Sequence, residues 1–239
     1  DADNALVDIV GNEVRVKSGA LIDFETNPTL NLNIQVTDNG TPGLTYTKAV
    51  TTAVLNVNEA PTDLTFTSSG IAENSAASTV IGTLSSTDPD AASSFTYALA
   101  TGNGTNDADN ALVDIVGNEV RVKSGASIDF ETNPLLNLNI QVTDNGTPGL
   151  TYDKAVTAAV LNVNEALTDL IFTSSGIAEN SSAGAVIGTL SATDPDAGSS
   201  FTYALVPGSG GNDADNILAE IVGNQVRVKS GAAIDFETN

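Results

Sequence analysis

Hydrophobic and polar residues alternate along the chain with a period of two. In residues 136–144 (LNLNIQVTD) the apolar side chains of Leu136, Leu138, Ile140 and Val142 alternate with Asn, Gln and Thr. Successive strand residues point to opposite faces, so this pattern predicts a half-buried β-strand. No segment sustains helical spacing.

Six further short strands are predicted in the same copy of this pattern. One pair flanks Gly117-Asn118, which suits a two-residue hairpin turn. The turn clusters NGTPG and TNDADN separate other segments. Seven short strands in about a hundred residues predict an antiparallel Greek-key β-sandwich. The six segments are residues 64–69, 79–87, 95–99, 115–116, 120–122 and 154–163.

The chain repeats itself with a period of 106 residues, and DFETN recurs at Asp23, Asp129 and Asp235. When residues 1–133 are laid on residues 107–239, 113 of the 133 positions are identical. Such a period is too long for ankyrin or leucine-rich repeats and fits one whole domain per copy. Identity between the copies therefore cannot single out functional residues.

Domain boundaries are predicted at the segment NVNEAP, residues 56–61, between the last strand of one copy and the first of the next. Pro61 favours an extended conformation there. The sequence thus reads as a window from a longer array. The expected parts are residues 1–59 (the second half of a domain), 60–165 (a complete domain) and 166–239 (the first two-thirds of a third).

Composition excludes several classes of function. The 239 residues include 30 acidic and 8 basic side chains, a net charge of -22, and no His, Cys, Met or Trp. A nucleic-acid binder that relies on a basic patch is excluded, as are His bases, Cys nucleophiles and thiolate or imidazole metal sites. No apolar run approaches a membrane span. Paired carboxylates such as Asp129 and Glu131 occur in glycosidases, but no Trp platform accompanies them, and we expect no enzyme.

Carboxylates gather in five short motifs, AENS, TDPDA, DFE, TDNG and NVNE. Calcium takes six to eight oxygen ligands, so this density of carboxylate and amide oxygens favours Ca²⁺ over softer metals. Two like charges about 4 Å apart repel by roughly 4 kcal/mol at an effective dielectric near 20, so convergence of the motifs favours a bound cation. The alternative is solvated turns whose charge serves solubility.

The order of these motifs resembles the cadherin repeat, especially the bacterial cadherin-like repeats of very large exported surface proteins. The resemblance covers the whole chain and implies cadherin- or immunoglobulin-like sandwiches arranged end to end. It also implies an extracellular location and calcium ions held where neighbouring repeats meet. The first implied ligand set is Asp23, Glu25, Asn56, Asn58, Glu59, Asp88, Asp90 and Asp144. The second is Glu73, Asp129, Glu131, Asn162, Asn164, Glu165, Asp194 and Asp196.

The linker departs from the family pattern. The usual Asp-x-Asn-Asp-Asn here reads Asn-Val-Asn-Glu-Ala at residues 56–60, which leaves the number of ions per junction open. Each set is also expected to lack one ligand, a glutamate before residue 1 and an aspartate after Asn239.

Two functional hypotheses follow from the resemblance. The first is a calcium-stiffened spacer of an extracellular adhesin or surface filament. The alternative is a repeat that itself mediates calcium-dependent homophilic or glycan binding. Head-to-tail self-association, with residues 1–59 and 166–239 of neighbouring molecules completing one another, is a further expectation. The 27-residue overlap between these segments argues against a clean fit.

Overall fold

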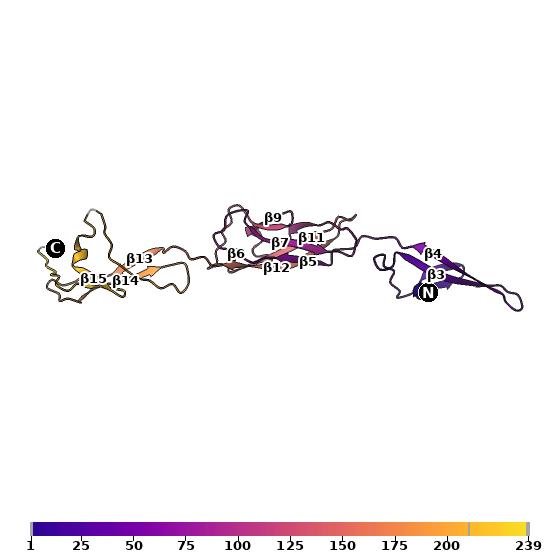
Figure 1. Ribbon diagram of the computed structural model, residues 1–239, viewed down its shortest axis with the longest axis horizontal. Coiled ribbons are helices and arrows are strands. Elements are labelled where there is room, and N and C mark those ends of the chain that lie inside the picture. The colour runs from indigo at the N-terminus through magenta and orange to yellow at the C-terminus, as the bar shows by residue number, and fades with distance from the viewer. Residues whose placement is uncertain (1, 210, 238–239) are drawn as a thin grey trace. The chain divides into compact units, whose positions relative to one another are not determined.

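The computed structural model describes residues 2–209 and 211–237 and shows an all-β chain (Figure 1). Its residues divide into two compact units. The first comprises Asp1–Ile128 and Leu135–Val160, and the second comprises Asp129–Pro134 and Leu161–Asn239. Among the described residues, no helix has the length and apolar character needed to span a bilayer.

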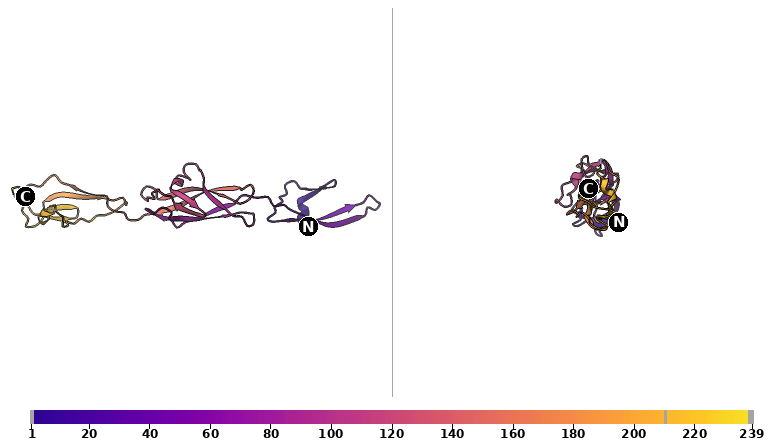
Figure 2. Two further views of the ribbon diagram at one scale, coloured as in Figure 1. Left: turned by 90° about the horizontal axis from the view of Figure 1, so that it is seen from above. Right: turned by 90° about the vertical axis from the view of Figure 1, so that its left-hand side faces the viewer.

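The central copy, most of which belongs to the first unit, is a β-sandwich of two four-stranded sheets ordered β5-β7-β10-β9 and β6-β12-β11-β8. Figure 2 shows its strands lying alongside one another. The first predicted strand, residues 64–69, corresponds to β5; the short β6, which was not predicted, follows Gly70, whose φ is 92°, and joins the other sheet. The other seven strands correspond to the seven predicted segments. The strands are β5 (Asp63–Thr67), β6 (Ile71–Ala72), β7 (Val80–Thr87), β8 (Thr96–Leu99), β9 (Val113–Val116), β10 (Glu119–Val122), β11 (Leu135–Thr143) and β12 (Thr151–Leu161).

The alternating pattern of β11 faces the core as predicted. Leu136, Leu138, Ile140 and Val142 are each no more than 1% exposed. Complete burial of such side chains stabilises the fold by about 1.5–3 kcal/mol each. Asn139 lies on the other face but is buried as well, and its side-chain Nδ2 donates to the carbonyl of Thr101 at 3.4 Å. The period-two pattern thus located the core face, while a polar contact explains the buried Asn.

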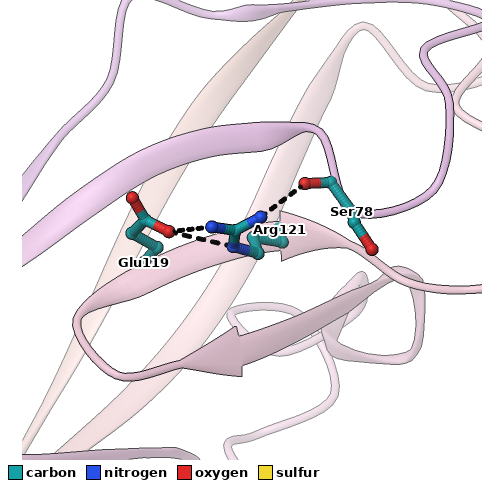
Figure 3. Close-up of polar contacts among 3 residues, drawn as sticks. All are labelled: Ser78, Glu119 and Arg121. Carbon is teal, nitrogen blue, oxygen red and sulfur yellow. Dashed lines mark hydrogen bonds and ion pairs between the residues drawn. The ribbon is translucent and has the colours of Figure 1, made fainter.

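The hairpin between β9 and β10 turns at Gly117, which adopts the predicted positive φ of 62°. On β10, Arg121 Nε donates to Glu119 Oε2 at 2.9 Å, and its Nη1 donates to the carbonyl of Ser78 at 3.0 Å (Figure 3). One guanidinium therefore ties the hairpin to the segment that precedes β7.

Residues 2–53 of the first unit contain two two-stranded sheets, β1-β2 and β3-β4. The β3–β4 hairpin has the register of β11–β12: Leu32 faces Val50 as Leu138 faces Val156. These elements are η1 (Ala2–Leu6), β1 (Val7–Val10), β2 (Glu13–Val16), β3 (Thr29–Thr37) and β4 (Thr45–Ala53); η2 (Asn110–Leu112) precedes β9 in the central copy.

The second unit has one four-stranded sheet, β13-β14-β16-β15, in the order of the central sheet β5-β7-β10-β9. Residues 202–205 carry the same TYAL sequence as β8, and residues 177–178 the same IA sequence as β6, yet neither segment forms a strand. The elements are β13 (Asp169–Thr173), β14 (Val186–Thr193), η3 (Ala214–Ile217), β15 (Ala219–Val222) and β16 (Gln225–Val228).

The described strand pairs all fall inside residues 1–59, 60–165 or 166–239. The expected domain parts and their boundaries stay a prediction.

Candidate calcium-binding clusters

The TDPDA turn that follows β7 ties the linker to the central copy. Asn56 Nδ2 donates to Asp90 Oδ1 at 2.8 Å, and the backbone N–H of Glu59 donates to Asp90 Oδ2 at 2.8 Å. Within the turn, the N–H of Asp90 donates to Asp88 Oδ1 at 2.9 Å. Two of the predicted ligands are therefore held side by side, and the linker is fastened to one of them.

Asp144, which directly follows β11, holds the middle of the linker. Asn58 Nδ2 donates to Asp144 Oδ2 at 3.0 Å and to the carbonyl of Pro148 at 3.1 Å. Although burial works to raise the pKa of Asp144, the N–H groups of Leu150 and Gly146 and the Asn58 amide outweigh it and lower the pKa. The carboxylate is thus kept ionised where a cation ligand is expected.

Gly146 is required by this arrangement. A Cβ built on it would lie 1.7 Å from Asn58 Oδ1. Since real side chains cannot approach so closely, any larger residue displaces Asn58. Sequence reasoning missed this role, although the NG turn after Asp144 was a signal of close backbone approach.

The DFE motif of the first copy brings further carboxylates to the same set. Asp23 Oδ1 accepts the backbone N–H groups of Glu25 and Thr26 at 2.9 and 3.3 Å, and the Thr26 N–H is the main cause of its lowered pKa.

The pKa of Glu25 is raised. Desolvation is the largest cause, followed by the negative charges of Glu59, Asp90 and Asp23. Three parts of the sequence thus place repelling carboxylates close together.

Asp88 provides a test of whether a cation fits these residues. Its Oδ2 is buried and has no hydrogen-bond partner, whereas its Oδ1 accepts the Asp90 N–H. A buried carboxylate oxygen without a donor is costly, and a hard cation is the ligand that satisfies it. The donor set is carboxylate and amide oxygen throughout, so Ca²⁺ fits and softer metals do not.

The second predicted set repeats these contacts within the second unit. The N–H of Glu165 donates to Asp196 Oδ2 at 2.7 Å, and the N–H of Asp196 donates to Asp194 Oδ1 at 2.9 Å. The counterpart of Asn56 in this linker, Asn162, has a different acceptor: its Nδ2 donates to Glu131 Oε1 at 3.1 Å. The linker is fastened to the TDPDA turn in both sets.

The remaining members of the second set are positioned by their own motifs. Asn164 Nδ2 donates to the Glu165 carbonyl at 3.2 Å, and Asp129 Oδ1 accepts the Thr132 N–H at 3.2 Å. Glu73 belongs to the first unit, where it is buried. Which of the sixteen predicted residues bind an ion stays a prediction.

A third acidic group was absent from the predicted sites. Carboxylate oxygens of Glu179, Asp235 and Glu237 lie within 4.8 Å of one another in the second unit. The 106-residue period relates them to Glu73, Asp129 and Glu131, so extending the repeat would have found them. Their proximity shows that the ENS and DFE motifs converge within one copy.

Comparison with known proteins identifies the type of repeat. No family model matches the chain. The chain is 30% identical over 196 residues to protocadherin alpha-11 of Pan troglodytes, which covers 78% of this chain and 20% of that protein. It is 28% identical over 199 residues to protocadherin alpha-2 of Homo sapiens, covering 79% of this chain and 21% of that protein.

A solved structure described as a protocadherin gammaB7 EC3-6 cis-dimer superposes with a TM-score of 0.65. It is 23% identical and covers 98% of this chain and 57% of that chain. The all-β fold is therefore that of cadherin domains, which are Greek-key β-sandwiches, and the chain is built of cadherin-like repeats. It spans about a fifth of the length of the curated relatives. These similarities do not support the expected bacterial source.

Proposed function

We propose that these cadherin-like repeats form a calcium-stiffened spacer in an extracellular adhesion or filament protein. One observation carries the proposal: Asp88 Oδ2 is buried without a hydrogen-bond donor, in the same turn as the Asp90 carboxylate to which the linker is fastened. The pKa of Glu25 is also raised, first by desolvation and then by the negative charges of Glu59, Asp90 and Asp23. The resemblance to cadherin repeats supports the same assignment, and the role is non-catalytic.

The chain's own contacts supply the positioning. Asn56 and the Glu59 N–H fasten the linker to Asp90, and Asn58 fastens it to Asp144. A bound calcium ion supplies positive charge that offsets carboxylate repulsion. We infer that the ligands are the two predicted sets, and that calcium reduces the freedom of the linker residues between predicted domains.

Self-association is the second candidate function. The similar solved structure described as a cis-dimer favours it over glycan binding. A spacer and a self-binding repeat differ in one measurement. Calcium stiffens a spacer at any protein concentration, whereas calcium-dependent homophilic binding grows with concentration.

Small-angle scattering of the 239-residue chain, in calcium and in chelator at low protein concentration, tests the proposal. We expect the curve to become that of a less flexible particle when calcium is added. Calorimetry should show that Glu25→Gln weakens calcium binding by about tenfold, or about 1.4 kcal/mol. Asp153→Asn is the matched control, because this exposed carboxylate on β12 accepts a hydrogen bond from Gln141 Nε2 and belongs to neither predicted ligand set. Identical scattering curves in both conditions exclude the stiffening.

A further inference from the structure

The linker at residues 56–61 is held by the nitrogen atoms of its amides. Asn58 Nδ2 donates to Asp144 Oδ2 at 3.0 Å and to the carbonyl of Pro148 at 3.1 Å. Asn56 Nδ2 donates to Asp90 Oδ1 at 2.8 Å. Hydrogen bonds from an N–H group to an ionised carboxylate are stronger than those between neutral groups. These asparagines therefore attach the linker as hydrogen-bond donors.

The partners of Asn58 determine which way its amide points. A carboxylate and a backbone carbonyl only accept hydrogen bonds, so both must face the nitrogen of the amide. The two N–H groups of Nδ2 match these two acceptors one for one. In the opposite orientation Oδ1 would face two oxygens, and both acceptors would lose a donor. Asn58 is half-buried, whereas its neighbours Val57 and Glu59 are exposed.

The TDNG turn positions the acceptor of Asn58 without help from the linker. Asp144 Oδ1 accepts the N–H groups of Gly146 and Leu150 at 2.9 and 3.0 Å, and Oδ2 accepts the linker amide. Asn145 Oδ1 accepts the Ser94 N–H at 2.9 Å, which joins this turn to the segment after TDPDA. The central copy thus presents the carboxylate in a fixed position.

The TDPDA turn presents Asp90 in the same way. Its N–H donates to Asp88 Oδ1 at 2.9 Å, and its carbonyl accepts the Ser93 hydroxyl at 3.0 Å. Its two side-chain oxygens accept Asn56 Nδ2 and the Glu59 N–H. With the two bonds at the TDNG turn, at least four hydrogen bonds connect the linker to the central copy, and each has its donor in the linker.

We propose that Asn58, together with Asn56, is a metal-independent clasp of the linker. Hydrogen bonds to Asp144 and Asp90 need no cation, so they hold the linker at calcium concentrations too low to fill the predicted ligand set. A carboxylate oxygen has two lone pairs and can keep its amide bond while it binds a cation. Calcium then tightens a linker that is already fastened. Only this role of calcium rests on the proposed function.

Asparagine suits the clasp, whereas aspartate would not. The Asn58 amide brings two donors and no charge to a region that contains the carboxylates of Asp88, Asp90 and Asp144. A carboxylate at position 58 would have no donor to offer, and its charge would repel that of Asp144. An aspartate would therefore make attachment of the linker depend on a cation, and the asparagine removes that dependence.

Cleavage by a Glu-specific protease at Glu59, in the middle of the linker, tests the clasp. In chelator, Asn58→Ala and Asn58→Asp should both be cut there about tenfold faster than the unsubstituted chain, because both lack the two donors and cleavage follows the population of the open linker. The same five residues, NVNEA, surround Glu165, so cleavage there is an internal control and should be unchanged.

Asn103→Asp is the matched control for the added charge. Asn103 is exposed in a loop of the central copy, and its Oδ1 accepts the N–H groups of Thr105 and Asn106 at 2.9 and 3.1 Å. An aspartate accepts the same two groups, so this variant adds one negative charge without removing a donor from the linker. Its cleavage at Glu59 in chelator should equal that of the unsubstituted chain.

Two results would overturn the clasp. One is cleavage of Asn58→Ala at Glu59, in chelator, at the rate of the unsubstituted chain. The other is faster cleavage of Asn58→Asp alone, since added repulsion and not the loss of donors would then be the cause.

The same measurement in calcium separates the clasp from the proposed function. If calcium slows cleavage of none of these chains while Asn58→Ala is faster in chelator, the calcium-stiffened spacer is wrong and the clasp is supported. If calcium slows cleavage but Asn58→Ala matches the unsubstituted chain in chelator, the clasp is wrong and the spacer is supported.

Discussion

The central copy and the second unit contain the same TYAL sequence in two different states. Residues 96–99 form β8, whereas residues 202–205 form no strand. The difference lies in the partner, because β8 is hydrogen-bonded to β11 and residues 202–205 have no such neighbour among the described residues. A period-two pattern thus shows that a segment suits a strand, but pairing decides whether it becomes one.

The comparison also distinguishes what each of the two sheets of a sandwich contributes. Among the described residues of the second unit, the sheet order of β13-β14-β16-β15 repeats that of β5-β7-β10-β9. Burial is what the second sheet adds, as Leu64 and Leu170 show.

Removing these two leucines gives the largest expected difference. Leu64→Ala should destabilise the central copy by about 2–5 kcal/mol, because it leaves a cavity in a closed core. Leu170→Ala should cost no more than about 0.5 kcal/mol, because the side chain is 62% exposed. Hydrogen exchange of peptides from each region measures both losses, and equal losses would contradict the comparison.

An added methyl group beside the linker gives the next largest effect. Gly146→Ala should cost about 1–3 kcal/mol, because its Cβ collides with Asn58. Gly40→Ala is the matched control, since the nearest atom to its Cβ is Asp38 Oδ1 at 3.2 Å. Proteolysis at residues 56–61 should rise in Gly146→Ala alone. Equal cleavage in the two variants would show that Asn58 does not hold the linker.

Acid should loosen the TDNG turns in both copies. The pKa values of Asp38 and Asp144 are lowered in the folded chain; backbone N–H groups lower that of Asp38, and for Asp144 they outweigh its burial. Because the folded pKa is the lower one, the stabilisation is present above the unfolded value of about 3.9 and is lost as the pH falls through the folded pKa.

Asp144→Asn should therefore reduce the dependence of the unfolding free energy on pH below about 4. Asp38→Asn should have the same kind of effect on the first copy. There the linker amide makes no contribution, because Asn58 donates to Asp144 and not to Asp38. Urea unfolding between pH 2 and 7 measures both slopes. If the unfolding free energy depends on pH as steeply in the variants as in the unsubstituted chain, these turns are not the source of that dependence.

The smallest expected effect concerns the ion pair between the sheets. Lys154→Ala should destabilise the central copy by less than about 1 kcal/mol, because Lys154 and Asp63 are both partly exposed. Lys48→Ala should cost less still, since the exposed Lys48 forms no ion pair with any of the described residues. Urea unfolding of dilute protein checks both, and a loss in Lys48→Ala would indicate a partner within its own chain.

The candidate site was predictable to the level of motifs. The density of oxygen ligands indicated calcium, and the resemblance to the cadherin repeat implied the two residue sets. The sequence could not show that Asp90 accepts both Asn56 and the Glu59 N–H, or that Asp88 Oδ2 is buried without a donor. These depend on which loops meet, and sequence spacing does not encode distances between loops.

Local pattern alone determined the alternation of β11, the turn at Gly117 and the 106-residue period, because each depends on neighbouring residues or on repetition. Tertiary structure decided that β5 and β6 join different sheets, that Gly146 must make room for Asn58, and that identical TYAL segments differ. The physical reason is that burial and strand pairing depend on residues far apart in the chain. Identical segments therefore differ in burial and in pairing when they have different partners.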